Sequence, residues 1–156
     1  MINVLFVCHG NICRSPMAEF MFKALVKEKG KEEFFNIESA AVSNEETGNP
    51  VYPPARQILS LHGISCRGKR ARRIREDDYM HSDYIIAMDR SNMRYLERML
   101  PSMDKTYLLM SFTGEDRNVA DPWYTGDFET CFEDIDAGCR AFYSFLLKTH
   151  KELTDV

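Results

Sequence analysis

A short apolar segment at the start of the chain most constrains the fold. Residues 2–7, INVLFV, carry no charge and are rich in strand-forming residues, which is typical of a strand buried in a parallel sheet. The segment ends at Cys8, and a loop of small and turn-forming residues follows. From Ser15 onward the apolar residues recur at helical spacing, at Met17, Phe20, Met21, Ala24 and Leu25. The opening of the chain therefore predicts a strand, a loop and a helix in that order.

The rest of the chain repeats this alternation. Ser15 suits the helix N-cap, Pro16 the first helical position and Gly30 the residue after the helix. Further strands are expected at residues 34–42, 83–88 and 107–110, and further helices at residues 56–61, after Asp89 and at 128–146. Alternating strands and helices predict a parallel sheet covered on both faces. Ligands bind such sheets at the carboxyl ends of the strands, where Cys8 would lie.

Size and charge limit the function classes. A chain of 156 residues with 44% hydrophobic and 28% charged residues fits one domain with a buried core. The net charge of −4 argues against a nucleic-acid-binding protein. Residues 67–75, RGKRARRIR, nevertheless carry six positive charges. They form either a solvated loop neutralised by the acidic residues 76–78 or a surface that attracts phosphorylated or acidic partners.

The cysteine content indicates the compartment. There are five cysteines, no basic and apolar secretory signal at the start, and no apolar stretch near the ~20 residues needed to cross a membrane. We therefore expect a reducing, cytoplasmic location, in which cysteines are catalytic or buried rather than disulfide-bonded. No Cys-x-x-Cys pair is present, so we expect no metal and no cofactor.

The loop between Cys8 and Arg14 has the chemistry of an anion site. A loop that leads from a strand into a helix N-terminus points backbone N–H groups inward. Gly10 permits the tight backbone, and Asn11 tolerates a left-handed conformation. Arg14 could hold two phosphoryl oxygens, and the Ser15 hydroxyl could donate to a Cys8 thiolate. Cys-x5-Arg-Ser therefore predicts phosphate transfer by a cysteine nucleophile.

A proton donor for the leaving group is expected in VADPWYTGDFE, residues 119–129. Asp121 precedes a proline and is therefore held in an extended conformation. Trp123 and Tyr124 could form an aromatic wall beside a substrate ring. On its own, Asp121 would be read more readily as the start of a turn.

Taken together, these segments resemble the low molecular weight protein tyrosine phosphatases. VCHGNICRSPMAE is similar to the phosphate loop of that family and ADPWY to its general-acid loop, and further similar segments follow in order along the chain. The resemblance implies a single domain over residues 1–156. It also implies a flavodoxin-like three-layer α/β sandwich of the phosphatase I-like type, with a central four-stranded parallel sheet.

The resemblance also implies residue roles. Cys8 would be the nucleophile of a phosphocysteine mechanism, Arg14 the phosphate clamp and Asp121 the general acid and then base, while Ser39 braces the loop. Cys13 would trap an oxidised Cys8 as a reversible disulfide. The remaining substrate or phosphate contacts would be His9, Gly10, Asn11, Ile12, Cys13, Ser15, Glu45, Trp123 and Tyr124. Phosphotyrosine proteins or peptides, with phosphate, sulfate or vanadate as site ligands, would be the partners of a monomer or weak dimer.

Three positions depart from the family pattern. His9 follows the nucleophile, where the family often has an aliphatic or small residue, and it either lines the pocket or points to solvent. Lys69 stands where a histidine is common, which puts the bracing network behind the loop in question. Glu45 occupies a rim position that is often aromatic, which predicts a shifted peptide preference.

Three other functions remain open. Arsenate reduction on the same fold needs relay cysteines, and none lies between Cys66 and Cys131. Protein-arginine phosphatases of this type carry threonine where Ile12 stands, and the bulkier residue favours a phenyl ring. A non-catalytic phosphate-binding module using the basic residues 67–75 would not be expected to keep Cys8, Arg14 and Asp121 together.

Overall fold

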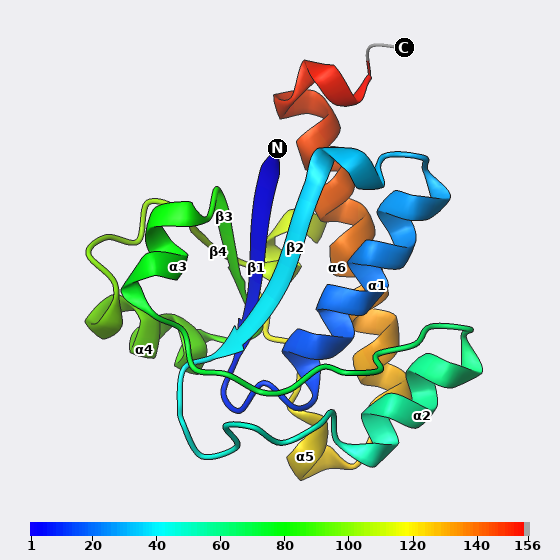
Figure 1. The fold of residues 1–156 in the computed structure, drawn as a ribbon, viewed down its shortest axis with the longest axis vertical. Coiled ribbons are helices and arrows are strands. Elements are labelled where there is room, and N and C mark those ends of the chain that lie inside the picture. The colour runs from blue at the N-terminus through cyan, green and yellow to red at the C-terminus, as the bar shows by residue number, and fades with distance from the viewer. Residues whose placement is uncertain (155–156) are drawn as a thin grey trace.

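Four parallel strands form the central sheet of this computed structural model, which describes residues 1–154 (Figure 1). The strand order is β2-β1-β3-β4, so the first strand lies inside the sheet. The strands are β1 (Ile2–Cys8), β2 (Phe35–Ala41), β3 (Tyr84–Ala87) and β4 (Thr106–Leu108). The fourth strand is shorter than predicted, because the chain turns into a 3-10 helix, η2 (Leu109–Thr113).

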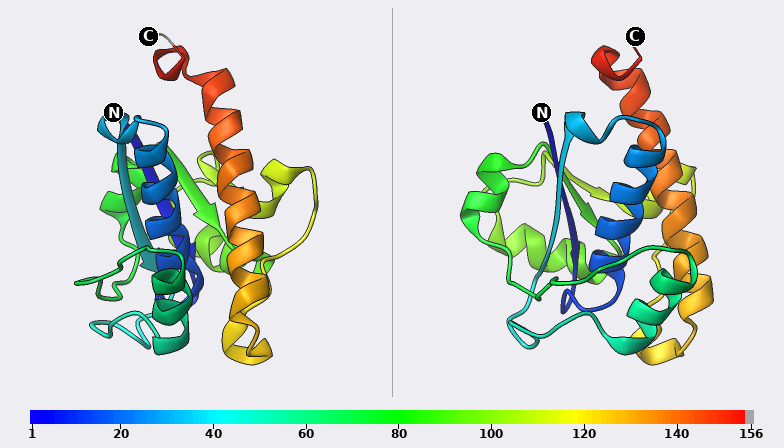
Figure 2. Two further views of the ribbon diagram at one scale, coloured as in Figure 1. Left: turned by 90° about the vertical axis from the view of Figure 1, so that its right-hand side faces the viewer. Right: turned by 45° about the vertical axis from the view of Figure 1, so that its right-hand side comes forward.

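Helices cover both faces of the sheet, as the alternating pattern predicts (Figures 1 and 2). One face carries α1 (Arg14–Glu28), α2 (Pro53–Leu61) and α6 (Phe128–Thr149), and the other carries α3 (Glu76–His81) and α4 (Arg90–Met99). Alternate residues of β1 point to the two layers: Val4 and Phe6 join the core under α1 and α6, and Leu5 and Val7 join the core under α4. The three layers form the predicted flavodoxin-like α/β sandwich.

Several local boundaries differ from the prediction. Helix α1 begins at Arg14 with Cys13 at the N-cap, so the expectation that Ser15 caps it is wrong. The Ser15 hydroxyl instead contacts the side chains of Cys8 and Asn11. Four short elements were not predicted: α3, the 3-10 helices η1 (Glu32–Phe34) and η3 (Lys151–Leu153), and α5 (Pro122–Thr125). Single-turn elements are too short to give a periodic pattern, which explains why the sequence does not reveal them.

The carboxyl ends of the strands meet at one end of the sheet. The loop after β1 and the short helix α5 lie together there (Figure 1). β1 and its neighbour β3 continue into α1 and α4, which lie on opposite faces, so the connections after these two strands leave the sheet in opposite directions. This switch point is where open parallel sheets form ligand crevices. Within residues 1–154, no helix is long and apolar enough to cross a membrane.

Candidate active site

The loop after β1 folds around the sulfur of Cys8. Asn11 has a positive φ of 59°, the left-handed conformation anticipated for it, and its backbone N–H lies 3.3 Å from the Cys8 sulfur. The Ser15 hydroxyl oxygen lies 3.0 Å from the same sulfur. Cys8 therefore has one backbone and one side-chain group positioned to donate to its thiolate form.

The neighbours of Ser15 decide which way its hydroxyl donates. The Asn11 side-chain oxygen accepts from the backbone N–H of Arg72 at 3.2 Å, which places the Asn11 amide nitrogen on the opposite side. That nitrogen donates to the Ser15 hydroxyl oxygen at 2.7 Å and to the Ser39 hydroxyl oxygen at 2.9 Å. The Ser15 hydrogen can then point at the Cys8 sulfur at 3.0 Å, which is nearer than its other acceptor, the Ala40 backbone oxygen at 3.5 Å.

A buried ionic group stands behind this network. Ser39 donates to Glu19 at 2.5 Å, and Glu19 is 4% exposed. The ammonium of Lys69 lies 3.2 Å from the Glu19 carboxylate and donates to the backbone oxygen of Ser39 at 2.9 Å. Burial lowers the pKa of Lys69, and the nearby Glu19 carboxylate partly offsets this. The lysine that departs from the family pattern thus takes part in the network behind the loop.

Arg14 is held from two directions at the floor of the pocket. One guanidinium nitrogen donates to Asp89 at 2.7 Å and to the backbone oxygen of Val119 at 2.8 Å, and the other lies 3.4 Å from Asp121. Burial lowers the pKa of Arg14, but Cys8, Asp89 and Asp121 together outweigh burial and raise the pKa above its usual value. The guanidinium is therefore a fixed positive charge beside Cys8.

Asp121 is positioned by the short helix that follows it. It is the N-cap residue of α5 in an extended conformation, as the following Pro122 implies, and one carboxylate oxygen accepts from the backbone N–H of Trp123 at 3.0 Å. The other oxygen faces Arg14. The carboxyl side chain is 26% exposed, so it can reach a substrate and water.

A cavity of about 250 Å³ joins these groups. Its lining combines the loop after β1, the segment after β2 and the start of α5: Cys8, His9, Gly10, Ile12, Cys13, Arg14, Glu45, Glu46, Asp121, Trp123 and Tyr124. Asn11, Ser15 and Ser39 lie behind the lining and brace it. Every predicted site residue is therefore in the lining or in the network behind it.

The rim of this cavity is aromatic on one side and acidic on the other. Tyr124 is 85% exposed, and Trp123 packs against Tyr52 with ring centroids 4.8 Å apart. On the acidic side, His9 lines the cavity with 40% of its side chain exposed, and its ring lies 3.2 Å from the Glu45 carboxylate. The pair is largely exposed, so it contributes at most about 1 kcal/mol to stability.

Comparison with known proteins identifies the family. A family model described as low molecular weight phosphotyrosine protein phosphatase matches residues 3–153. The chain belongs to this family. The phosphatase is 40% identical over 153 residues to the low molecular weight protein-tyrosine-phosphatase YfkJ of Bacillus subtilis, covering 95% of this chain and 97% of the relative. It is 40% identical over 147 residues to the human low molecular weight phosphotyrosine protein phosphatase, covering 90% and 92%.

Solved structures agree. The crystal structure of YfkJ superposes on the phosphatase with a TM-score of 0.93, covering 96% of this chain and 97% of that one. The structure of a Drosophila arginine phosphatase superposes with a TM-score of 0.84 at 33% identity, covering 91% and 96%. Family membership makes this chain a cysteine-dependent phosphatase, and the general mechanism of the family passes through a phosphocysteine.

Sequence reasoning missed several residues of the phosphatase site. Asp89 was expected only as the residue before a helix; it caps α4 and also binds Arg14. Its position just after β3, at the same sheet edge as Cys8, was the available signal. The sequence contains no signal for the roles of Glu19 and Tyr52, because these roles depend on partners far away in the chain.

Proposed function

We propose that this phosphatase hydrolyses phosphotyrosine in proteins and peptides, and small aryl phosphates, with Cys8, Arg14 and Asp121 as its catalytic residues. The Cys8 sulfur attacks phosphorus and forms the S–P bond as the P–O bond to the tyrosine oxygen breaks. Asp121 gives its proton to that oxygen. Water then attacks the phosphocysteine while Asp121 takes a water proton, which releases phosphate and the Cys8 thiolate. Arg14 neutralises the phosphoryl oxygens throughout.

The observation that carries this proposal is the shared cavity. Asp121 lies 107 positions beyond Arg14 in the chain, yet it lines one space of about 250 Å³ together with Cys8 and Arg14. Ile12, Trp123 and Tyr124 give this space an apolar side against which a phenyl ring can pack.

A pH–rate profile with an aryl phosphate tests the assignment. Cys8→Ser should abolish a vanadate-sensitive activity that is insensitive to chelators. Asp121→Ala should lower kcat by about 10²–10⁴-fold and remove the limb of the profile that reports the acid. The loss should be greatest for leaving groups as basic as tyrosine, whose pKa is about 10. Wild-type turnover in Cys8→Ser, or an Asp121→Ala profile of unchanged shape, would contradict the assignment.

Phosphoarginine is a second candidate substrate because of the similarity to the Drosophila arginine phosphatase. The side chain of Ile12 in the cavity lining favours an aromatic ring over a charged guanidinium. We therefore expect kcat/KM to be higher for a phosphotyrosine peptide than for the matched phosphoarginine peptide. Ile12→Thr should narrow that difference, and a wild-type preference for phosphoarginine would reverse the choice of substrate.

The acidic rim favours basic residues beside the phosphotyrosine. Glu45 and Glu46 both line the cavity, and among residues 1–154 the ion-pair partner of Glu45 is the half-exposed His9. We expect Glu45→Gln to lower kcat/KM several-fold for arginine-flanked phosphopeptides, most strongly at low salt, and to leave a small aryl phosphate unaffected. Glu33→Gln, an exposed acid outside the cavity lining, is the matched control.

Cys13 gives the site a redox partner. Burial, and next the nearby Cys8, raise the pKa of Cys13, so it remains a thiol while Cys8 reacts. Hydrogen peroxide would convert Cys8 to a sulfenic acid, and attack by the Cys13 thiol would form a disulfide and release water. A reducing, cytoplasmic compartment would reverse this step. Dithiothreitol should restore activity to peroxide-treated wild type but much less to Cys13→Ser.

A further inference from the structure

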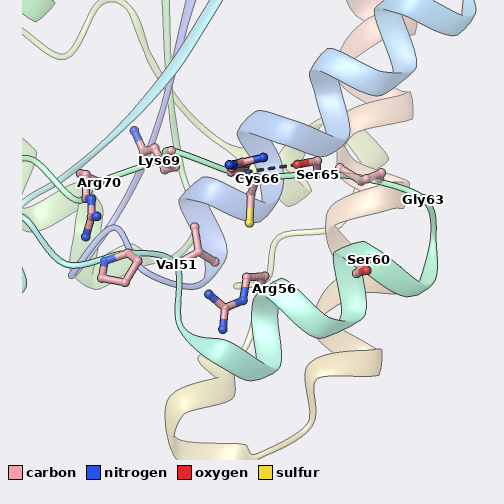
Figure 3. A pocket seen from close by; sticks show the side chains of 12 residues that line it. Val51, Arg56, Ser60, Gly63, Ser65, Cys66, Lys69 and Arg70 are labelled. Atoms are coloured by element: carbon pink, nitrogen blue, oxygen red, sulfur yellow. Dashed lines mark hydrogen bonds between the residues drawn. The ribbon is translucent and has the colours of Figure 1, made fainter.

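A second and larger cavity lies beside the catalytic one, and the proposed reaction does not use it. Its volume is about 610 Å³, within the range of small-molecule sites. It is lined by Arg56 and Ser60 of α2, by Pro50 and Val51 before that helix, and by residues 63–70 after it (Figure 3). The segment 43–52 separates it from the catalytic cavity, whose wall includes Glu45 and Glu46.

The lining of this cavity is strongly basic. It contains Arg56, Arg67, Lys69 and Arg70 and no acidic residue. Lys69 is neutralised by Glu19, but within residues 1–154 no carboxylate lies within ion-pair distance of the three arginines. Figure 3 shows Arg56 and Arg70 on opposite walls, with the Cys66 sulfur pointing toward Arg56. Three unneutralised guanidiniums around one concavity are unexpected in a protein of net charge −4.

The acidic run after the basic segment does not explain these charges. Of residues 76–78, Asp78 forms a two-point ion pair with Arg72, at 2.9 and 3.0 Å. Arg72 lies outside the cavity lining. The acidic run therefore neutralises Arg72, whereas the arginines that line the cavity keep their positive charge.

We propose that this cavity is a second anion site, which binds a small molecule carrying several phosphate groups. Guanidinium groups present donors that match phosphate oxygens, and more than one arginine suits a ligand with more than one phosphate. An acidic segment of the protein substrate fits less well, because it would have to pass Glu45 and Glu46 to reach the cavity. Both a nucleotide and an inorganic polyphosphate have the required chemistry.

The cavity also touches the network behind the catalytic loop. Lys69 lines it and binds both Glu19 and the backbone oxygen of Ser39. Ser39 accepts from Asn11, which donates from its backbone to Cys8. An anion that draws the Lys69 ammonium toward the cavity would therefore alter the support of the loop, and ligand binding would change the turnover.

The test uses inorganic tripolyphosphate and amide NMR of the full chain, with orthovanadate present to occupy the catalytic cavity. The amides of Gly63 and Gly68, in the second cavity, should shift saturably, and Gly10 in the catalytic loop should shift less, with the same saturation curve. ATP in place of tripolyphosphate tests whether a nucleoside is accepted. If Gly63 and Gly68 do not respond to either ligand, the proposal is wrong. The readout does not depend on turnover, so it stands apart from the proposed function.

Matched variants separate a site from general attraction. Arg67→Gln and Arg70→Gln should each raise the Kd for tripolyphosphate about tenfold. Arg75→Gln removes the same charge from an exposed position in the same segment but outside the cavity lining, and should change the Kd less than twofold. Equal effects of all three would mean diffuse electrostatic attraction and would overturn the proposal. The proposal would also be overturned if Arg67→Gln and Arg70→Gln lowered kcat/KM for acidic phosphopeptides but left the Kd for tripolyphosphate unchanged.

Discussion

The Ser15 hydroxyl oxygen accepts from the Asn11 amide and lies 3.0 Å from the Cys8 sulfur, which is a nearer acceptor for the hydroxyl hydrogen than the Ala40 backbone oxygen at 3.5 Å. The contact is buried, since Ser15 is 0% and Cys8 3% exposed. A hydrogen bond to a thiolate in such surroundings stabilises sulfur both as nucleophile and as leaving group. Ser15 thus serves the chemistry of Cys8 rather than the start of α1.

We expect Ser15→Ala to slow breakdown of the phosphocysteine. Thiolate is the leaving group in that step, and the loss of a hydrogen bond to a charged group costs about 1.5–3 kcal/mol, or about ten- to a hundredfold in kcat. Rapid-quench measurements should find more phosphoenzyme at steady state. Ser43→Ala, which removes a hydroxyl bonded to the backbone oxygen of His9 but not to sulfur, should have little effect.

Asp89 can be tested separately as a cap and as a partner of Arg14. Its two oxygens divide these tasks: one accepts from the backbone N–H of Asn92 at 2.7 Å and the other from Arg14 at 2.7 Å. Asp89→Asn keeps the cap but weakens the grip on Arg14, so kcat/KM should fall about tenfold while stability changes by less than about 1 kcal/mol. Asp89→Ala should lower both kcat/KM and the free energy of unfolding. Equal catalytic activity of Asp89→Asn and wild type would show that Val119 alone positions Arg14.

Lys69 is expected to matter for stability because it neutralises Glu19, whose side chain is only 6% exposed. Lys69→Met should lower the free energy of unfolding by about 3 kcal/mol, since it leaves a buried carboxylate with less charge compensation. Lys23→Met removes the other, 43% exposed, partner of Glu19 and should cost less than about 1 kcal/mol. The double variant Glu19→Gln/Lys69→Met should recover part of the loss in urea unfolding, and strict additivity would contradict the pairing.

Asp78 should make stability depend on acid pH. Burial raises its pKa, but hydrogen bonds from Arg72 and from the backbone N–H of Arg75 outweigh burial and bring the pKa below the usual 3.8. Its contribution is therefore fully present above pH 3.8 and is lost as the pH falls toward the lower, folded-state value. Asp78→Asn should unfold about 1–3 kcal/mol more easily at pH 7. The difference between variant and wild type should shrink below pH 3.8 in urea titrations, and a difference independent of pH would exclude this ion pair as its cause.

The sequence by itself determined the order of strands and helices, the phosphate loop and the three proposed catalytic residues. Apolar periodicity places β1 and α1, and the loop between them is local, so Cys8, Asn11 and Arg14 follow from adjacent residues. Asp121 was recognisable only together with the phosphate loop, because ADPWY resembles the general-acid loop of the family, whereas an Asp-Pro pair alone indicates a turn. Single-turn helices and the exact start of α1 were not determined, because their ends depend on contacts rather than on periodicity.

Only the tertiary structure decided how these residues are supported. Arg14 is fixed by Asp89 and Val119, which lie 75 and 105 positions further along the chain. Lys69, in a loop, forms an ion pair with Glu19 of α1. The arginines of the second cavity come from α2 and from the segment that follows this helix. Hydrogen bonds and ion pairs of this kind act over a few ångströms in space, whereas periodicity in the sequence reports only which face of an element is buried.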